Sequence, residues 1–153
     1  MRTSTTALLV TLLAGAAGGL TGCTGGSTGV TAAPLATAPA CTAALAAAPA
    51  TLLGRSRTPL PVAGTAAWGE PAVVVRCGLP EQPPTTLRCL SVGAVDWIVD
   101  DARDPWVFTA YGRSPTVEVR VPASFGSGSA PAALSLLGPV EAALPRTARA
   151  CIG

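Results

Sequence analysis

The cysteines are the residues whose type and spacing say most about the chemistry of this chain. There are five, and an odd number leaves one cysteine for a role other than internal pairing. The first of them, Cys23, directly follows an apolar run, whereas the other four are spread over the rest of the chain, at positions 41, 77, 89 and 151. We therefore consider Cys23 separately from the other four.

The segment before Cys23 has the pattern of an export signal. Arg2 provides a positive charge, and residues 7–20 (ALLVTLLAGAAGGL) form an uncharged apolar run of 14 residues. A membrane-spanning helix needs about 20 apolar residues, so this run is too short to be one. The stretch at its end resembles a bacterial lipobox, made up of Leu20, Thr21, Gly22 and Cys23.

The lipobox resemblance implies a location and a partner. Signal peptidase would recognise Leu20 and cleave between Gly22 and Cys23. Acyl chains attached through the Cys23 sulfur would then anchor the mature protein in the lipid bilayer. Two or more acyl chains anchor a protein stably. We therefore expect a lipoprotein on the extracytoplasmic face of the cell membrane. An ordinary signal peptide with an incidental cysteine and an uncleaved anchor helix are the alternatives.

The other four cysteines are expected to form disulfides, because exported domains lie in an oxidising environment. Three pairings are possible. Cys77 and Cys89 flank the loop between two predicted strands, and Cys41 and Cys151 lie in the terminal regions of the domain. We therefore predict the pairs 77 with 89 and 41 with 151. Zinc binding is the alternative, but the chain has neither C-x-x-C pairs nor histidine, and we expect no metal or other cofactor.

Catalytic groups are scarce. Without histidine the usual general base is missing, and paired cysteines provide no thiol nucleophile. Residues 25–29 (GGSTG) match a nucleophile elbow but lack its strand, helix and histidine. Asp96 and Glu118 remain as an acid/base pair for glycoside hydrolysis. A carboxylate cluster that includes Asp96 is a candidate calcium site, with Asp100, Asp101 and Asp104 as its other members. We expect a protein that is not an enzyme.

A ligand site is suggested by an arginine beside aromatic residues. Arg113 follows Tyr111 in the motif YGRSP, and an arginine there can clamp a carboxylate or phosphate. Trp106 and Trp68 are the further aromatic candidates for this site. The alternative is that the aromatic residues fill a small core and that Arg113 lies in a turn.

The composition limits the partners and the size of the core. After removal of residues 1–22, nine arginines face eight acidic residues, so no strong field attracts nucleic acid. Residues 23–40, rich in glycine, alanine and threonine, are interpreted as the lipidated cysteine and a flexible tether. Residues 41–153 are expected to form one domain.

The pattern of this domain predicts an α+β fold. It favours helices at both ends, over residues 41–54 and 131–145, the second with a bend near Gly138 and Pro139. Between them, four antiparallel strands are expected at residues 72–77, 88–99, 106–111 and 116–121, with Gly93 as a bulge or bend in the second. Val117, Val119 and Val121 alternate with polar residues, so both helices are expected on one apolar face of the sheet.

Several short motifs occur in an order that resembles the domain of unknown function 3515, an actinobacterial family of exported proteins and lipoproteins. The motifs are Cys41 with Leu45 and Pro49, Arg57, WGEP (68–71), RCG (76–78), Cys89, VDW (95–97), YGRSP (111–115), VEVRVP (117–122) and Cys151. The resemblance implies an exported fold and no known activity. We expect a binding or accessory module of the cell envelope whose partner is a cell-wall component or an envelope protein. A carboxylate-dependent hydrolase and a structural surface protein are the alternatives.

The lipobox generates a direct test. The mature protein is expected to begin at Cys23 and to partition into detergent, whereas the Cys23→Ala variant should not, because the acyl chains need the sulfur. Intact mass of the native protein shows whether the chain begins at Cys23 and whether lipid is attached, and phase separation measures the partitioning into detergent. A native chain that retains residues 1–22, or that carries no lipid on Cys23, would contradict the prediction.

Overall fold

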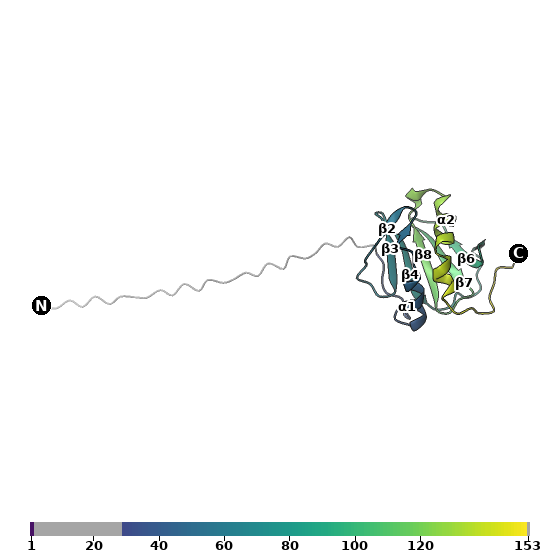
Figure 1. Cartoon of the computed structure of the whole chain (residues 1–153), viewed down its shortest axis with the longest axis horizontal. Coiled ribbons are helices and arrows are strands. Elements are labelled where there is room, and N and C mark those ends of the chain that lie inside the picture. The colour runs from purple at the N-terminus through teal and green to yellow at the C-terminus, as the bar shows by residue number, and fades with distance from the viewer. Residues whose placement is uncertain (2–28, 153) are drawn as a thin grey trace.

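A computed structural model of the chain describes Met1 and residues 29–152 (Figure 1). The lipobox residues Leu20, Thr21, Gly22 and Cys23 lie outside the described residues. Among those that are described, no helix is long and apolar enough to cross a membrane.

The fold is α+β, as predicted, but the sheet has eight antiparallel strands rather than four. The strands are β1 (Thr51–Leu52), β2 (Arg55–Thr58), β3 (Thr65–Trp68), β4 (Val73–Leu79), β5 (Arg88–Val92), β6 (Val95–Asp100), β7 (Trp106–Tyr111) and β8 (Thr116–Val121). The helices are α1 (Pro39–Ala46), η1 (Ala123–Phe125), α2 (Ser129–Leu136) and α3 (Gly138–Ala142).

Two meanders meet at the centre of the sheet. The strand order is β1-β2-β3-β4-β8-β7-β6-β5, so β1 to β4 form one half and β5 to β8 the other. Val119 of β8 lies opposite Val75 of β4 and Phe108 of β7, which places large apolar side chains in one row across the join. Rows of this kind define an inner face of the sheet, because side chains on a strand alternate between faces.

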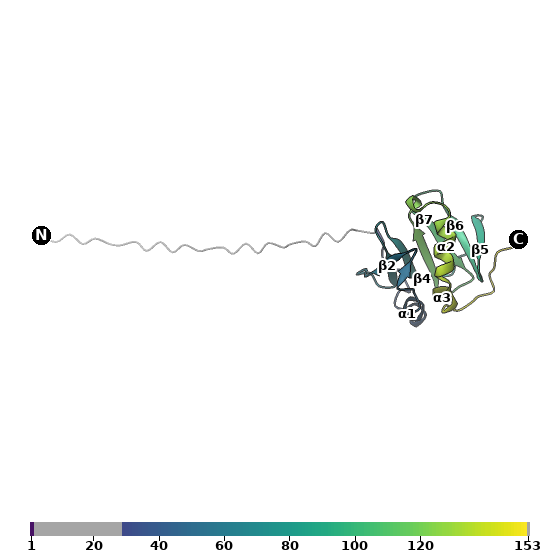
Figure 2. The same ribbon diagram turned by 45° about the horizontal axis from the view of Figure 1, so that its top comes forward.

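The helices pack against this inner face (Figure 2). Val117, Val119 and Val121 are fully buried there, in one core with Ala44 of α1 and Leu134 of α2. The predicted alternation in β8, with both helical regions on the apolar side, is confirmed. The C-terminal helix also bends where glycine and proline indicated, since α2 ends one residue before Leu137 and α3 begins one residue after it.

The N-terminal helix is shorter than predicted and is followed by a hairpin. Helix α1 ends at Ala46, and the chain turns between β1 and β2 at Leu53 and Gly54. Both residues have positive φ angles, of 50° and 75°, and this backbone conformation is typical of a tight two-residue hairpin turn. Strand β2 is exposed at every residue, so it carries no apolar alternation that would have revealed it.

Gly93 lies in a turn and is not a bulge within one long strand. Residues 88–99 form the hairpin of β5 and β6, in which Val92 pairs with Val95 around Gly93 and Ala94. Gly93 has φ of 60°, a conformation that glycine adopts at little cost. The turn projects from one end of the sheet and becomes part of the candidate site.

The folded unit begins earlier than the predicted boundary at residue 41. Val30, Ala33 and Ala36 are buried, and the Leu35 amide donates to the Gly78 carbonyl at 2.8 Å. A Cβ on Gly78 would lie 2.4 Å from the Leu35 carbonyl carbon, so this packing depends on the absence of a side chain. The interpretation of residues 23–40 as a flexible tether is therefore wrong from Val30 onward.

The four described cysteines form disulfides, as predicted, but the predicted pairing is wrong. Cys41 pairs with Cys77, and Cys89 pairs with Cys151. The predicted link between Cys77 and Cys89 assumed neighbouring strands, whereas β8, β7 and β6 separate β4 from β5. Cys77 is also in the inner core beside Cys41, while Cys89 pairs with Ile98 on the opposite, outer face.

Peptide mapping without reduction is expected to recover the links 41 to 77 and 89 to 151. Replacing Cys41 and Cys77 together by alanine should lower the free energy of unfolding by about 4 kcal/mol, because the disulfide closes a long loop in the unfolded chain. Urea unfolding measures the change. Recovery of a 77 to 89 link from native protein would overturn the strand order.

Candidate functional site

The four residues predicted to form a ligand site are not brought together. Trp68 is fully buried, and its indole Nε1 donates to the Pro49 carbonyl at 2.9 Å. Trp106 is half-buried on the inner face beside α2, and Tyr111 lies on the outer face. Arg113 is buried between β7 and β8. The two tryptophans and Tyr111 therefore lie in separate places, and Arg113 alone of the four lines a cavity that contains two guanidinium groups.

That cavity lies at one end of the sheet and has a volume of about 240 Å³. One wall is the turn between β5 and β6, and the other is the junction of α2 with α3. The lining is mostly apolar, with two arginines: Val92, Gly93, Ala94, Val95, Arg113, Leu134, Ser135, Gly138, Ala142 and Arg146. We call this cavity the Arg113–Arg146 pocket.

Arg113 is held rigidly by the backbone around it. Its Nε donates to the Glu141 carbonyl at 3.2 Å, and its Nη1 donates to the Gly112 carbonyl at 3.2 Å. Only 5% of the residue is exposed. These two bonds engage Nε and Nη1 and leave the Nη2 amino group for another acceptor. The guanidinium is therefore positioned before any ligand arrives.

Arg146 supplies the second positive charge. Its backbone forms an antiparallel bridge with Arg113, and its Nη2 donates to the Ala94 carbonyl at 3.2 Å. Burial, and then repulsion from Arg146, lowers the pKa of Arg113 from its ordinary value. Arginine nevertheless stays protonated in proteins. Within residues 29–152, no carboxylate lies within 4.0 Å of either guanidinium.

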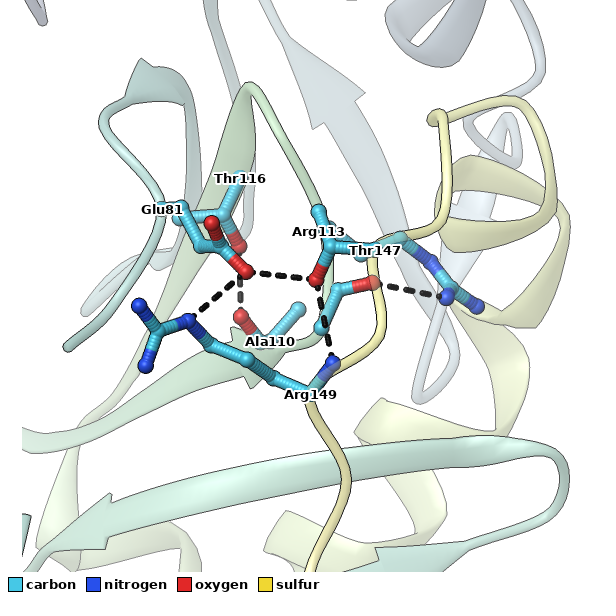
Figure 3. A network of polar contacts seen from close by, with 7 residues as sticks. Glu81, Ala110, Arg113, Thr116, Thr147 and Arg149 are labelled. Atoms are coloured by element: carbon cyan, nitrogen blue, oxygen red, sulfur yellow. Dashed lines mark hydrogen bonds and ion pairs between the residues drawn. The ribbon is translucent and has the colours of Figure 1, made fainter. Parts of the chain in front are cut away.

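The segment that carries Arg146 is fastened to the sheet by a polar network (Figure 3). The Thr147 amide donates to the Gly112 carbonyl at 3.0 Å, and the Thr147 hydroxyl donates to Glu81, which also pairs with Arg149 Nε at 2.9 Å. A Cβ on Gly112 would lie 2.1 Å from the Arg149 carbonyl oxygen. Glycine at position 112 therefore lets residues 145–149 lie close enough to place Arg146 beside Arg113.

Glu141 is a buried carboxyl group that sequence reasoning missed. It is fully buried in α3, and neither of its carboxyl oxygens has a hydrogen-bond partner in the part of the chain that the structure describes. Burial raises its pKa to about 8, and the charge of Arg113 only partly opposes this shift. The sequence did contain an indication that Glu141 is unusual, because it is the only charged residue between Arg120 and Arg146.

The candidate acid/base pair is engaged in structural contacts. Asp96 accepts hydrogen bonds from the Ser91 hydroxyl at 2.6 Å and from the Cys151 amide at 2.8 Å. Glu118 accepts from Arg120 Nε at 2.6 Å and lies 3.8 Å from Arg76 Nη2. Strand β7 lies between the two carboxylates, and neither of them lines the Arg113–Arg146 pocket.

The acidic residues that suggested calcium binding are also dispersed. Asp101 pairs with Arg88 at 2.6 Å, and Asp104 accepts from the Ala123 amide at 2.8 Å. Over residues 29–152, no group of three acidic, cysteine or histidine side chains is arranged to hold a metal ion. These contacts give each carboxylate a partner within the fold.

A larger cavity of about 500 Å³ lies on the outer face, between the loop before β5 and the C-terminal segment. Its lining is neutral and contains the Cys89–Cys151 disulfide, Ile98 and Tyr111. It offers apolar contact but no charged group that would orient a ligand. The Arg113–Arg146 pocket is the better candidate, because it combines apolar walls with two guanidinium groups.

The buried carboxyl group leads to a prediction about stability. Folded protein holds a proton on Glu141 up to about pH 8, whereas the unfolded chain releases it near pH 4.5. The unfolded state thus binds fewer protons in this window, and the free energy of unfolding falls by up to about 1.4 kcal/mol per pH unit as pH rises. Above pH 8 this contribution no longer changes.

Urea unfolding at pH 5 and pH 8 tests this. The Glu141→Gln variant should gain stability relative to the native chain on going from pH 5 to pH 8, because glutamine does not ionise. Glu70→Gln is the matched control, since Glu70 is exposed. Parallel pH profiles for native and Glu141→Gln protein would contradict the prediction.

Comparison with known proteins places the chain in a family. A family model described as "Protein of unknown function (DUF3515)" matches residues 3–148, which is nearly the whole chain. No curated protein matches the chain, and no solved structure matches it. The chain belongs to the DUF3515 family of proteins of unknown function.

Proposed function

We propose that this protein is a lipid-anchored, extracytoplasmic binding module of the cell envelope, and that its ligand carries an anionic group bound in the Arg113–Arg146 pocket. The observation that carries the proposal is the presence of two guanidinium groups without a carboxylate partner in one cavity. Pre-positioned arginines favour carboxylates and phosphates, because their planar donors match the acceptor geometry.

Two features support the extracytoplasmic part of the proposal. The lipobox pattern at residues 20–23 is typical of export and acylation, and both disulfides favour an oxidising compartment. Only residues 24–29 separate Cys23 from the packed Val30, and the seven Cα-to-Cα steps from Cys23 to Val30 span at most about 25 Å. An acylated Cys23 would therefore keep the pocket close to the membrane surface, where envelope precursors emerge.

The engaged carboxylates favour binding over hydrolysis. A glycosidase needs two carboxyl groups facing one sugar-binding cleft, about 5 to 10 Å apart. Asp96 and Glu118 instead accept internal hydrogen bonds, and Glu141 is buried. A hydrolase remains the second candidate, and the experiment below includes an assay for it.

The test compares soluble cell-wall fragments that have free carboxylates with the same fragments after amidation. Full-length protein in a neutral detergent is expected to bind only the former, as measured by calorimetry. Arg146→Gln should weaken this binding about tenfold, because one charged hydrogen-bond donor is lost. Arg103→Gln is the control, since Arg103 is an exposed arginine outside the pocket.

Two results would contradict the proposed function. Equal binding of free and amidated fragments would show that the anionic group is not what the pocket recognises. Turnover of the fragments that disappears in Asp96→Asn or Glu118→Gln would establish the hydrolase instead.

A further inference from the structure

We infer that the Arg113–Arg146 pocket binds a small aliphatic carboxylate, and that the buried carboxyl group of Glu141 controls this binding through its charge state, because ionised Glu141 offsets the positive charge of Arg113. This inference rests on the proposed function of the same pocket and specifies its ligand class and its regulation.

The size and the walls of the pocket select the ligand class. Its volume of about 240 Å³ is below the range of about 300–1,000 Å³ that is usual for drug-sized ligands. Val95, Leu134 and Ala142 contribute apolar walls, while the arginines contribute positive charge. A phosphate ion would leave these walls without an apolar partner. A carboxylate on a short aliphatic chain can pair its charge with the arginines and pack its chain against the apolar walls.

The geometry of Arg113 favours a carboxylate over a neutral acceptor. Its guanidinium is fixed by the Glu141 and Gly112 carbonyls, so binding costs little side-chain entropy. The Nη2 group remains available, and Arg146 adds a second cation beside it. A charged acceptor forms a stronger hydrogen bond with these groups than a neutral amide does. The pocket should therefore discriminate a carboxylate from its amide.

Glu141 is placed to oppose the same ligand. Its backbone carbonyl accepts from Arg113 Nε, so the residue belongs to the support of the pocket, and its carboxyl group is buried without a partner. Arg113 is the charged group that acts on Glu141, while Arg146 and Asp96 act on Arg113 itself. Helices α1 and α2, which pack against α3, contain no charged residue. Arg113 is therefore the cation that an ionised Glu141 would compensate.

The protonation state of Glu141 decides the charge that a ligand meets. While Glu141 is neutral, Arg113 and Arg146 present two positive charges with no carboxylate of the described residues within 4.0 Å. Once Glu141 loses its proton, its negative charge offsets that of Arg113 and repels an incoming carboxylate. Because its pKa is raised to about 8, binding should be strong at pH 6 and weaker at pH 9. The ligand carboxylate is ionised at both values, so its own charge does not change.

Calorimetric titration with butyrate tests the inference, with butyramide as the neutral isostere and full-length protein in a neutral detergent. We expect butyrate to bind about tenfold more tightly at pH 6 than at pH 9, and butyramide not to bind. Glu141→Gln should bind butyrate equally at both values, with the affinity that the native chain has at pH 6. A pH dependence caused by any other group that titrates in this range, such as an α-amino group, would persist in this variant. Circular dichroism verifies that it is folded.

The outcomes separate this inference from the proposed function. Butyrate binding that does not depend on pH, or a pH dependence that persists in Glu141→Gln, would overturn the role of Glu141 and leave the binding module intact. Phosphate binding in place of butyrate binding would overturn the ligand class. If butyrate, phosphate and carboxylate-bearing cell-wall fragments all fail to bind, the pocket is not an anion site and the proposed function fails as well.

Discussion

The pairing of β4 with β8 is the interaction on which the rest of the fold depends. It joins two meanders that are separate in the sequence, and it aligns Val75 with Val119 and Cys77 with Val117 on the inner face. This row is the floor on which the helices pack, and Cys77 there reaches Cys41 of α1. Because a shift of one residue would turn every side chain to the other face, the pairing also determines which face is buried.

The candidate site lies at the end of the sheet where β7 connects to β8. The connection between β7 and β8 carries Gly112 and Arg113, and the C-terminal segment returns to it through the bridge to Arg146. The disulfide between Cys151 and Cys89 then links this segment to β5, an edge strand of the sheet. The two arginines thus come from parts of the chain that only the closed fold brings side by side. Their mutual repulsion opposes this arrangement, and the backbone bonds on either side maintain it.

Burial explains why Glu141 stands apart from the other carboxylates. Asp96 and Glu118 have partners that satisfy their charge, whereas the buried carboxyl of Glu141 has none among the described residues. A buried carboxyl without a partner is stabilised by keeping its proton, because the charged form would lose hydration without compensation. The cost of burying it lowers stability at neutral pH, and such costs are frequent at functional sites. The unfavourable burial of Glu141 beside the support of Arg113 is therefore an argument for a functional role of the Arg113–Arg146 pocket.

Local pattern was enough to predict β4, β7 and β8, the helix bend and the burial of the alternating valines, but it merged β5 and β6 into one strand. It was also enough to single out Arg113, because an arginine beside an aromatic residue and a turn is visible in the sequence. Strands β1, β2 and β3 were missed, because they are short and their residues are exposed or small. They form strands through pairing with one another and, at β3, with β4. Local composition and spacing establish which residues favour strands, which segments bend and which cysteines form disulfides. The pairing of the cysteines, the approach of Arg146 to Arg113 and the burial of Glu141 follow from the folded arrangement instead, because each depends on contacts between residues far apart in the chain.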